Sequence, residues 1–362
     1  MPQSRSRRSS GAINKLRRGE KRAPYVRVTG TLVCVSATLP GMTCRIIIDP
    51  QQAARALHRG KLVALPTETV YGLGADATNA QAVARIFAAK QRPLFDPLIL
   101  HLASRDWLPR VVTYVPSAAE RLAKKFWPGP LTLVLPKRPD VLDLVTSGLP
   151  TVAVRVPRHK LMQQVLAQVG RPVAAPSANR FGRLSPTRPI HVVQQLGDAI
   201  DYVLDGGKCR VGVESTILQV DEENRVTLLR PGGLSLERIE AVVGRVRRPR
   251  RSTKDQLAAP GMLPSHYAPR TPIRLVKRPP PLPTGRDQWG VLALHSVPCH
   301  GYACYEILSE EGNLVTAAAR FFDALHRLDQ AGLDLIIAVE FPEEGLGRAI
   351  NDRLRRAAAH HH

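Results

Sequence analysis

Two polar clusters in the first third of the chain contain the residue types needed to bind an anionic substrate. PTETVYGLG at 66–74 follows the apolar segment 62–65 and presents hydroxyls and a carboxylate beside two glycines. KQRP at 90–93 supplies an ammonium from Lys90 and a guanidinium from Arg92, which suit the oxygens of a polyphosphate. On an extended segment the two cations would point the same way. A polar turn without a ligand and two solvated surface charges are the alternatives.

Three further clusters follow apolar segments. APSANRFGRLSPT at 175–187 is rich in Ser, Asn and Gly, GVESTI occupies 212–217, and LRPGG at 229–233 places Arg230 beside a tight turn. A loop that follows a strand is a common position for a ligand in α/β proteins. Each cluster alone is equally compatible with an ordinary turn.

Alternating apolar and amphipathic segments predict a mixed-sheet α/β domain over residues 42–243 to position these clusters. Asp49 or Pro50 is expected to open its first helix, and Asn79 to cap the second. Strands are predicted at 44–48, 61–65, 97–102, 131–135, 151–156, 172–175, 201–204, 213–220 and 225–229, and helices at 50–59, 79–89, 116–126, 158–169, 188–196 and 235–243.

Residues 244–284 are basic and rich in proline, which predicts a linker. PGMLPSHYAP at 260–269 contains Met, His and Tyr, so we expect this part to dock on a neighbouring surface. A small Rossmann-like α/β domain is predicted at 285–357, with strands at 290–295, 303–307 and 333–340 and helices at 314–329 and 346–357. It has no GxGxxG or Walker sequence, and we expect no cofactor there.

Composition narrows the class of protein. The 362 residues carry a net charge of +22 and 44% hydrophobic residues, with no apolar run of 18 residues that would predict a membrane span. Five scattered cysteines argue against a disulfide framework and favour the cytoplasm. Cys299, His300 and Cys304 lack the four-ligand spacing of a zinc site, so no metal site is predicted.

Both ends of the chain lie outside these predicted domains. Residues 1–41 form a basic extension that we expect to be disordered, because blocks of like charge repel one another. A nucleic-acid arm, a targeting segment and an upstream extension of the reading frame remain open as its role. Residues 358–362 end in three histidines that resemble a fragment of a purification tag.

Read in order, the motifs closely resemble the YrdC-like family of threonylcarbamoyl-AMP synthases, also called L-threonylcarbamoyladenylate synthases. The motifs are PTETVYGLG, KQRP with PLILH, PGPLTLVL, TVAVRVP, PSAN, GVESTI and RPGG, and PGMLPSHYAP with GLGRAINDRL resembles the long two-domain form. This resemblance implies a YrdC-like mixed twisted sheet followed by a linker and a smaller Rossmann-like domain. It also implies a nucleotidyltransferase that uses L-threonine, bicarbonate or CO2, and ATP with Mg2+, and releases threonylcarbamoyl-AMP and pyrophosphate. The product would pass to a separate tRNA threonylcarbamoyl transferase, which modifies an adenosine in tRNA.

The same resemblance implies a role for individual residues. The nucleotide would be bound by Lys90, Arg92, Asp96, Thr151, Asn179, Ser185, Arg230 and Tyr267, and threonine by Thr67, Tyr71, His101, Arg155, Ser177 and Ser215. Lys90, Arg92, Ser177 and Asn179 would act on the reacting groups. Asp96 departs from the family, in which Asn is common at this position, so Mg2+ or Arg92 would have to screen its carboxylate. The segment around Tyr267 is a candidate lid over the active-site mouth.

Two other classes of protein fit parts of the sequence. The positive charge would suit a double-stranded RNA or tRNA binding module without catalysis, although a strongly basic chain also binds RNA non-specifically. ATP consumption that depends on threonine would distinguish the enzyme from this module. The carbamoyl-transfer proteins of hydrogenase maturation share the YrdC-like domain, but they carry paired CxxC zinc fingers and an acylphosphatase segment that this sequence lacks.

Overall fold

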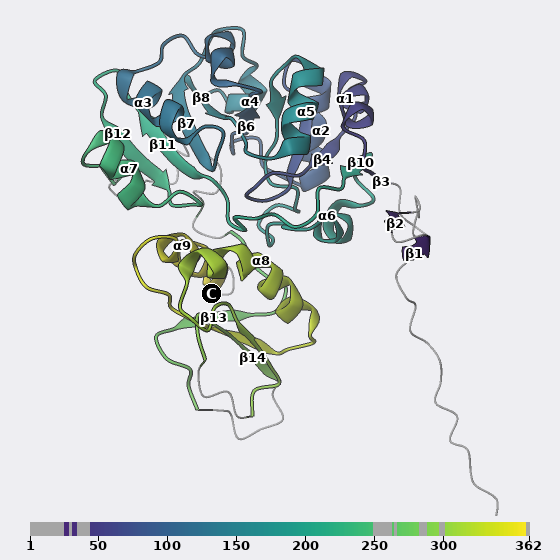
Figure 1. Ribbon diagram of the computed structural model, residues 1–362, viewed down its shortest axis with the longest axis vertical. Coiled ribbons are helices and arrows are strands. Elements are labelled where there is room, and N and C mark those ends of the chain that lie inside the picture. Colours follow the sequence, from purple (N-terminus) through teal and green to yellow (C-terminus); the bar gives the residue numbers. More distant parts are fainter. Residues whose placement is uncertain are drawn as a thin grey trace, which may run out of the picture. The chain divides into compact units, whose positions relative to one another are not determined.

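The computed structural model describes residues 25–28, 31–34, 44–248, 263, 266–281, 288–296 and 301–359 (Figure 1). Contacts divide the chain into Met1–Ala37 and Thr38–His362. In the first unit, β1 (Tyr25–Val28) and β2 (Thr31–Cys34) pair as an antiparallel hairpin. The disorder predicted for the rest of 1–41 lies outside the described residues. The domains described below all belong to the second unit.

The larger domain is built on a ten-stranded sheet (Figure 1). The sheet contains both parallel and antiparallel pairs, which confirms the predicted mixed sheet. In sheet order the strands are β12 (Val226–Arg230), β11 (Thr216–Val220), β7 (Leu131–Pro136), β8 (Thr151–Arg155), β6 (Ile99–His101), β9 (Val173–Ala174), β5 (Gly72–Asp76), β4 (Val63–Leu65), β10 (Tyr202–Leu204) and β3 (Arg45–Ile47). Its helices are α1 (Pro50–His58), α2 (Ala80–Lys90), the 3-10 helix η1 (Arg105–Arg110), α3 (Ser117–Phe126), α4 (Asp143–Thr146), α5 (Lys160–Val169), α6 (Pro189–Leu196) and α7 (Leu236–Val243).

Local capping explains where the first two helices begin. The Asp49 side chain accepts hydrogen bonds from the backbone N–H groups of Gln51 and Gln52, and Pro50 fills the first helical position, where its missing N–H costs nothing. The Asn79 side chain accepts from the backbone N–H of Ala82 at the start of α2. Both predicted helix starts are therefore confirmed.

Strand β5 corrects the prediction for the PTETVYGLG segment. A polar, glycine-bearing turn after the strand at 61–65 was the interpretation of this segment with or without a ligand, but Gly72–Asp76 pairs with β4 on one side and β9 on the other. A Cβ atom at Gly74 would lie 2.6 Å from the Leu65 side chain, so glycine is needed for the close approach of the two strands. The sequence pattern missed this strand because glycine has low strand propensity and only the tertiary contacts reveal its purpose.

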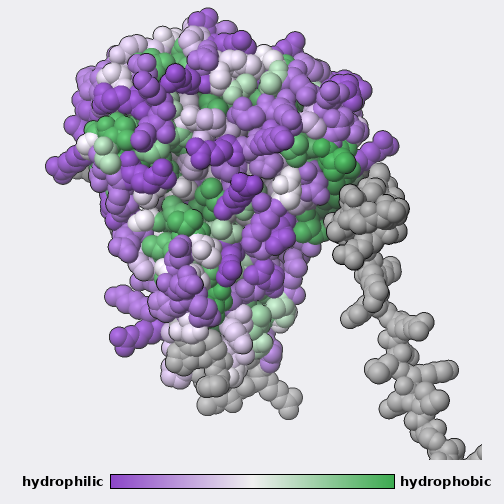
Figure 2. All heavy atoms as spheres, in the orientation of Figure 1, coloured by the Kyte–Doolittle hydropathy of each residue, from purple (hydrophilic) through white to green (hydrophobic). Residues whose placement is uncertain are grey.

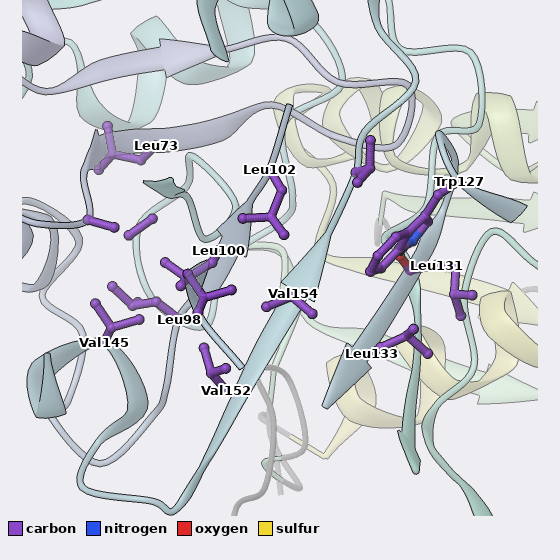
Figure 3. Close-up of a cluster of buried hydrophobic side chains, with 14 of the residues drawn as sticks. Leu73, Leu98, Leu100, Leu102, Trp127, Leu131, Leu133, Val145, Val152 and Val154 are labelled. Atoms are coloured by element: carbon purple, nitrogen blue, oxygen red, sulfur yellow. Dashed lines mark hydrogen bonds between the residues drawn. The ribbon is translucent and has the colours of Figure 1, made fainter. Parts of the chain in front are cut away.

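The core of this domain is aliphatic. Figure 3 shows Leu73, Leu100 and Val154, which come from β5, β6 and β8, in one buried cluster that also includes Trp127. Each buried side chain of this size contributes about 1.5–3 kcal/mol relative to an exposed one. The surface in Figure 2 is mostly hydrophilic with small apolar patches. Because the buried side chains of this cluster join its strands, the sheet is a rigid support for the polar loops at its strand ends.

The smaller domain contains a parallel sheet in the order β13 (Ile273–Val276), β16 (Leu335–Val339), β14 (Trp289–Ala293) and β15 (Cys304–Ile307), with α8 (Leu314–Gln330) and α9 (Gly347–Ala358). The predicted Rossmann-like fold is confirmed. Strand β13 was not predicted, and it lies inside the predicted linker. Its partner β16 is distant in sequence, and no local signal shows that pairing.

The two domains of this unit share an apolar cluster. Val70 and Val213 of the larger domain pack with Phe321 and Phe322 of α8. Tyr267, from the segment between the domains, belongs to the same cluster. Docking of the 260–269 segment was predicted, and its described residues confirm it. No helix among the described residues is long and apolar enough to cross a membrane.

Stacked histidines at this contact predict a pH-dependent stability. The His191 and His326 rings stack with centroids 3.8 Å apart, close to Asp323. Burial, reinforced by His326, lowers the pKa of His191 to about 3, and burial also lowers the pKa of His326. Below about pH 6.5 the unfolded chain therefore binds protons that the folded protein excludes, and His191 alone lowers stability by about 1.4 kcal/mol for each pH unit below that value.

The measurement is the melting temperature between pH 8 and pH 5. We expect it to fall as the pH drops below about 6.5, and we expect His191→Gln to show a shallower fall. Equal slopes for the wild type and the variant would assign the acid sensitivity to other groups.

Candidate active site

The polar loops converge on one cavity of about 40 Å³ in the larger domain. Its lining includes eight of the predicted site residues, namely Thr67, Arg92, His101, Arg155, Ser177, Ser215, Arg230 and Tyr267. These side chains come from clusters separated by more than one hundred residues of sequence. The fold therefore brings the scattered motifs to one place.

One side of the cavity is organised around Arg155, at the end of β8. Its guanidinium forms a 2.6 Å ion pair with Glu68 and donates a 2.9 Å hydrogen bond to the Thr69 hydroxyl. The second oxygen of Glu68 accepts from the backbone N–H of Arg158. Thr67 donates to the carbonyl of Val70, which fixes the turn before β5. A buried, oriented arginine of this kind can bind a small carboxylate.

His101 lies beside Arg155 because β6 and β8 are parallel neighbours in register. Burial, with a further contribution from Arg155, lowers the pKa of His101 to about 3. The imidazole is therefore neutral at physiological pH. Its buried Nδ1 has no hydrogen-bond partner within the described part of the chain, so it can serve a ligand as a hydrogen-bonding group but not as a charge.

The other side of the cavity is cationic. Arg230, at the end of β12, donates to the carbonyl of Ser215 at 3.0 Å, and both residues are buried. Arg92 forms a 2.9 Å ion pair with Asp96 and also donates to the carbonyl of Pro97. Burial lowers the pKa of each arginine, but a guanidinium remains charged in proteins. Two fixed positive charges therefore face this part of the cavity.

The Asp96 carboxylate lies where the positive charge of Arg92 can screen it. Arg92 and Mg2+ were the two groups expected to do so. Burial raises the pKa of Asp96 against the opposing effect of Arg92. Because the carboxylate is turned toward Arg92, it is not among the residues that line the cavity.

Lys90 is placed differently from the expectation of two cations on an extended segment. It is the last residue of α2, and Gln91 after it adopts a left-handed conformation with φ of 54°. The buried ammonium donates to the carbonyls of Ser177 and Asn179. Burial, then Arg92, lowers its pKa well below the ordinary value. In this structure Lys90 anchors the PSAN loop, and its contact with a triphosphate stays a prediction.

Four other predicted residues do not line the cavity. Asn179 and Ser185 lie behind its wall, where the Asn179 amide donates to two backbone carbonyls and the Ser185 hydroxyl donates to Glu214. The Tyr71 hydroxyl donates to the carbonyl of Gly207. Thr151 begins β8 at the end opposite Arg155. Their roles in binding stay predictions.

Tyr267 and His266 line the cavity next to each other. Tyr267 has a left-handed φ of 65°, and the N–H of Ala268 donates to the carbonyl of Gly182 at 2.7 Å. Burial and the nearby Arg92 hold the pKa of His266 well below its usual range, so this ring is neutral. The segment is thus fixed by specific contacts to the larger domain.

Sequence reasoning missed several residues of the site. Thr69, Glu214 and His266 line the cavity. Each lies in a motif in which only a neighbouring residue was assigned to the site. Arg353 of α9 contacts Glu214 and lies in the GLGRAINDRL motif, but its side chain was assigned no role from the sequence. Only the approach of the second domain reveals it.

The fold defines a two-domain α/β protein with one polar cavity, and similarity to known proteins shows its family. Residues 55–232 match the Sua5/YciO/YrdC family model, which is described as telomere recombination, and residues 234–359 match the threonylcarbamoyl-AMP synthase C-terminal domain. The chain belongs to the threonylcarbamoyl-AMP synthase family, in its long two-domain form, and is a nucleotidyltransferase.

Individual relatives resemble the chain over most of its length. The threonylcarbamoyl-AMP synthase of Pyrococcus abyssi is 43% identical, over 85% of this chain and 93% of the relative, and that of Bacillus subtilis is 42% identical, over 86% and 93%. The crystal structure of P. abyssi Sua5 complexed with L-threonine superposes with a TM-score of 0.79 at 41% identity, over 85% of this chain and 94% of that one.

Proposed function

We propose that this protein condenses L-threonine, bicarbonate or CO2, and ATP to threonylcarbamoyl-AMP and pyrophosphate for the modification of adenosine in tRNA. The observation that carries the proposal is that one cavity is lined by two groups of residues. Thr67 and His101 lie next to Arg155 or its partner Thr69, and Arg92 lies close enough to Arg230 for their charges to interact. The first suits an amino acid and the second suits phosphates. The complex of the P. abyssi relative with L-threonine supports the choice of amino acid.

The reaction requires positioning more than covalent chemistry from the protein. The threonine amine adds to CO2 with loss of a proton, or to bicarbonate with loss of water. The resulting carbamate oxygen then attacks the α-phosphorus in line while pyrophosphate leaves. Arg155 would orient the threonine carboxylate, and the neutral His101 would supply a hydrogen bond. Arg92 and Arg230 would offset the negative charge that grows on the phosphates. Ser177 and Ser215 would bind neutral oxygens between the two halves.

Magnesium would enter as part of the ATP complex. No group of three or more His, Cys, Asp or Glu side chains within the described ranges is arranged to hold a metal. Mg2+ usually keeps several waters and binds through substrate phosphates. Asp96 already pairs with Arg92, so the ion would compensate phosphate charge without a cage built by the protein.

We infer that the Tyr267 segment moves when the substrates bind. Sites for ligands of drug-like size measure roughly 300–1,000 Å³, whereas about 40 Å³ is open beside His266 and Tyr267. We propose that this segment is a lid that opens for ATP and closes on the bound substrates. Lys90, Asn179 and Ser185 would then contact the nucleotide, and Tyr71 would support the wall on the threonine side. The cytoplasm, with its tRNA threonylcarbamoyl transferase, is the proposed setting.

Pyrophosphate release with each amino acid in turn tests this function. The protein is incubated with ATP, Mg2+ and bicarbonate, and we expect release to depend on threonine. Release that ignores the identity of the amino acid would contradict the proposed substrate. Tight RNA binding without any threonine-dependent turnover would instead favour the RNA-binding module.

A further inference from the structure

Arg353 of α9 extends from the smaller domain to the wall of the active site. Its side chain is 0% exposed, and its Nε donates to a carboxylate oxygen of Glu214 at 2.9 Å. Its Nη1 donates to the carbonyl of Pro231, and its guanidinium lies 5.2 Å from the centroid of the Tyr267 ring. One arginine of the second domain thus contacts three different segments near the cavity.

Most of these contacts lead to the nucleotide side of the cavity, while Glu214 also directly precedes Ser215 in the chain. The second carboxylate oxygen of Glu214 accepts the hydroxyl of Ser185, so Arg353 and Ser185 share one carboxylate. Pro231 directly follows Arg230 in the chain. Ser185, Arg230 and Tyr267 are all residues that we assign to ATP. Among the contacts of the described residues, none joins Arg353 to Thr67, His101 or Arg155 on the threonine side.

The chemistry of this contact requires an arginine. Glu214 is buried, and a buried carboxylate is costly unless it is paired and hydrogen-bonded. A guanidinium can pair with Glu214, donate to a backbone carbonyl and lie against an aromatic ring at the same time, because its donors form a planar fork. An ammonium at this position could satisfy the charge but not all three contacts.

We propose that Arg353 is a positioning residue through which the smaller domain sets the nucleotide half of the active site. It holds Glu214, and through it Ser185, holds the loop after Arg230, and stabilises Tyr267 in the closed position. This inference rests on the proposed function for the identity of the ligand as ATP. It gives the second domain a defined part in nucleotide affinity and no direct part in binding threonine.

The test compares Arg353→Met and Arg353→Lys with the wild type. Binding of α,β-methylene-ATP with Mg2+ is measured by calorimetry, and the KM values for ATP and threonine are measured by pyrophosphate release, all below the melting temperature of each variant. We expect Arg353→Met to weaken binding of the analogue and raise the KM for ATP by about 10- to 100-fold, with the KM for threonine changed by less than about twofold. Arg353→Lys should fall between it and the wild type.

Arg348→Met is the matched control. Arg348 lies on the same helix and pairs across the domains with Glu237, but that pair is partly exposed. Surface ion pairs contribute little, so this variant should bind the analogue as the wild type does. Equal weakening by Arg348→Met and Arg353→Met would show a general effect of loosened domains and would overturn the proposal.

The double variant Glu214→Gln/Arg353→Met separates positioning from folding. Removing the unpaired buried carboxylate should raise the melting temperature above that of Arg353→Met, while binding of the analogue stays weak because Ser185 and Tyr267 lack their support. Recovery of binding together with stability would reduce Arg353 to a structural role. If the wild type bound the analogue but showed no threonine dependence, the proposed reaction would fail while the inference about Arg353 would still be decided by the binding data.

Discussion

Arg155→Met is expected to lower kcat/KM for threonine by roughly 30- to 5,000-fold, the equivalent of about 2–5 kcal/mol for loss of a buried charge partner. The reason is that Arg155 is the buried cation on the side of the cavity assigned to the amino acid. Binding of α,β-methylene-ATP should change little, because the cations on the nucleotide side remain. The measurements are pyrophosphate release against threonine concentration and calorimetric binding of the analogue.

The partner of Arg155 provides the control for folding. The single variant leaves Glu68 buried without its 2.6 Å ion pair, which will also lower stability. Glu68→Gln/Arg155→Met removes that unpaired charge, so the melting temperature should rise again while threonine use stays impaired. Arg138→Ala, which breaks an exposed pair with Asp140, should leave both quantities unchanged. Restored threonine use in the double variant would show that Arg155 does not bind the amino acid.

Arg92→Ala should have the second largest effect, on ATP. Removing a buried guanidinium that lines the cavity is expected to raise the KM for ATP by at least about 30-fold, with a smaller change in the KM for threonine. The single variant also leaves Asp96 without its ion pair. In Asp96→Asn/Arg92→Ala that charge is absent, so stability should recover without recovery of ATP binding.

Lys90→Ala distinguishes a direct contact from an indirect one. Because the Lys90 ammonium binds two carbonyls of the PSAN loop, this variant should weaken ATP binding through the loop and also lower the melting temperature. Exposed Lys124 on α3 supplies the control substitution. Identical patterns for Lys90→Ala, Arg92→Ala and Arg155→Met would contradict the division of the cavity into two halves.

Local sequence was sufficient for most of the secondary structure of both domains. Asp49 and Asn79 cap their helices through their own side chains, and apolar runs such as 131–135 form buried strands close to their predicted bounds. Such features depend on interactions among near neighbours, so the sequence shows them directly. The ordered motifs likewise indicated the family.

Tertiary structure alone decided how the parts meet. Strands β5 and β13 depend on partners that local propensity does not reveal. The Lys90 ammonium was expected to face an anionic ligand, but it donates to a backbone carbonyl of a loop 87 residues away in the sequence. The contact of Arg353 with Glu214 joins side chains 139 residues apart. The amino-acid sequence by itself determined the available residue types and the positions where helices begin. Burial between distant segments determined which charged side chains pair with one another. The reason is that a buried charge is costly unless an opposite charge lies close to it in space, wherever that partner stands in the chain.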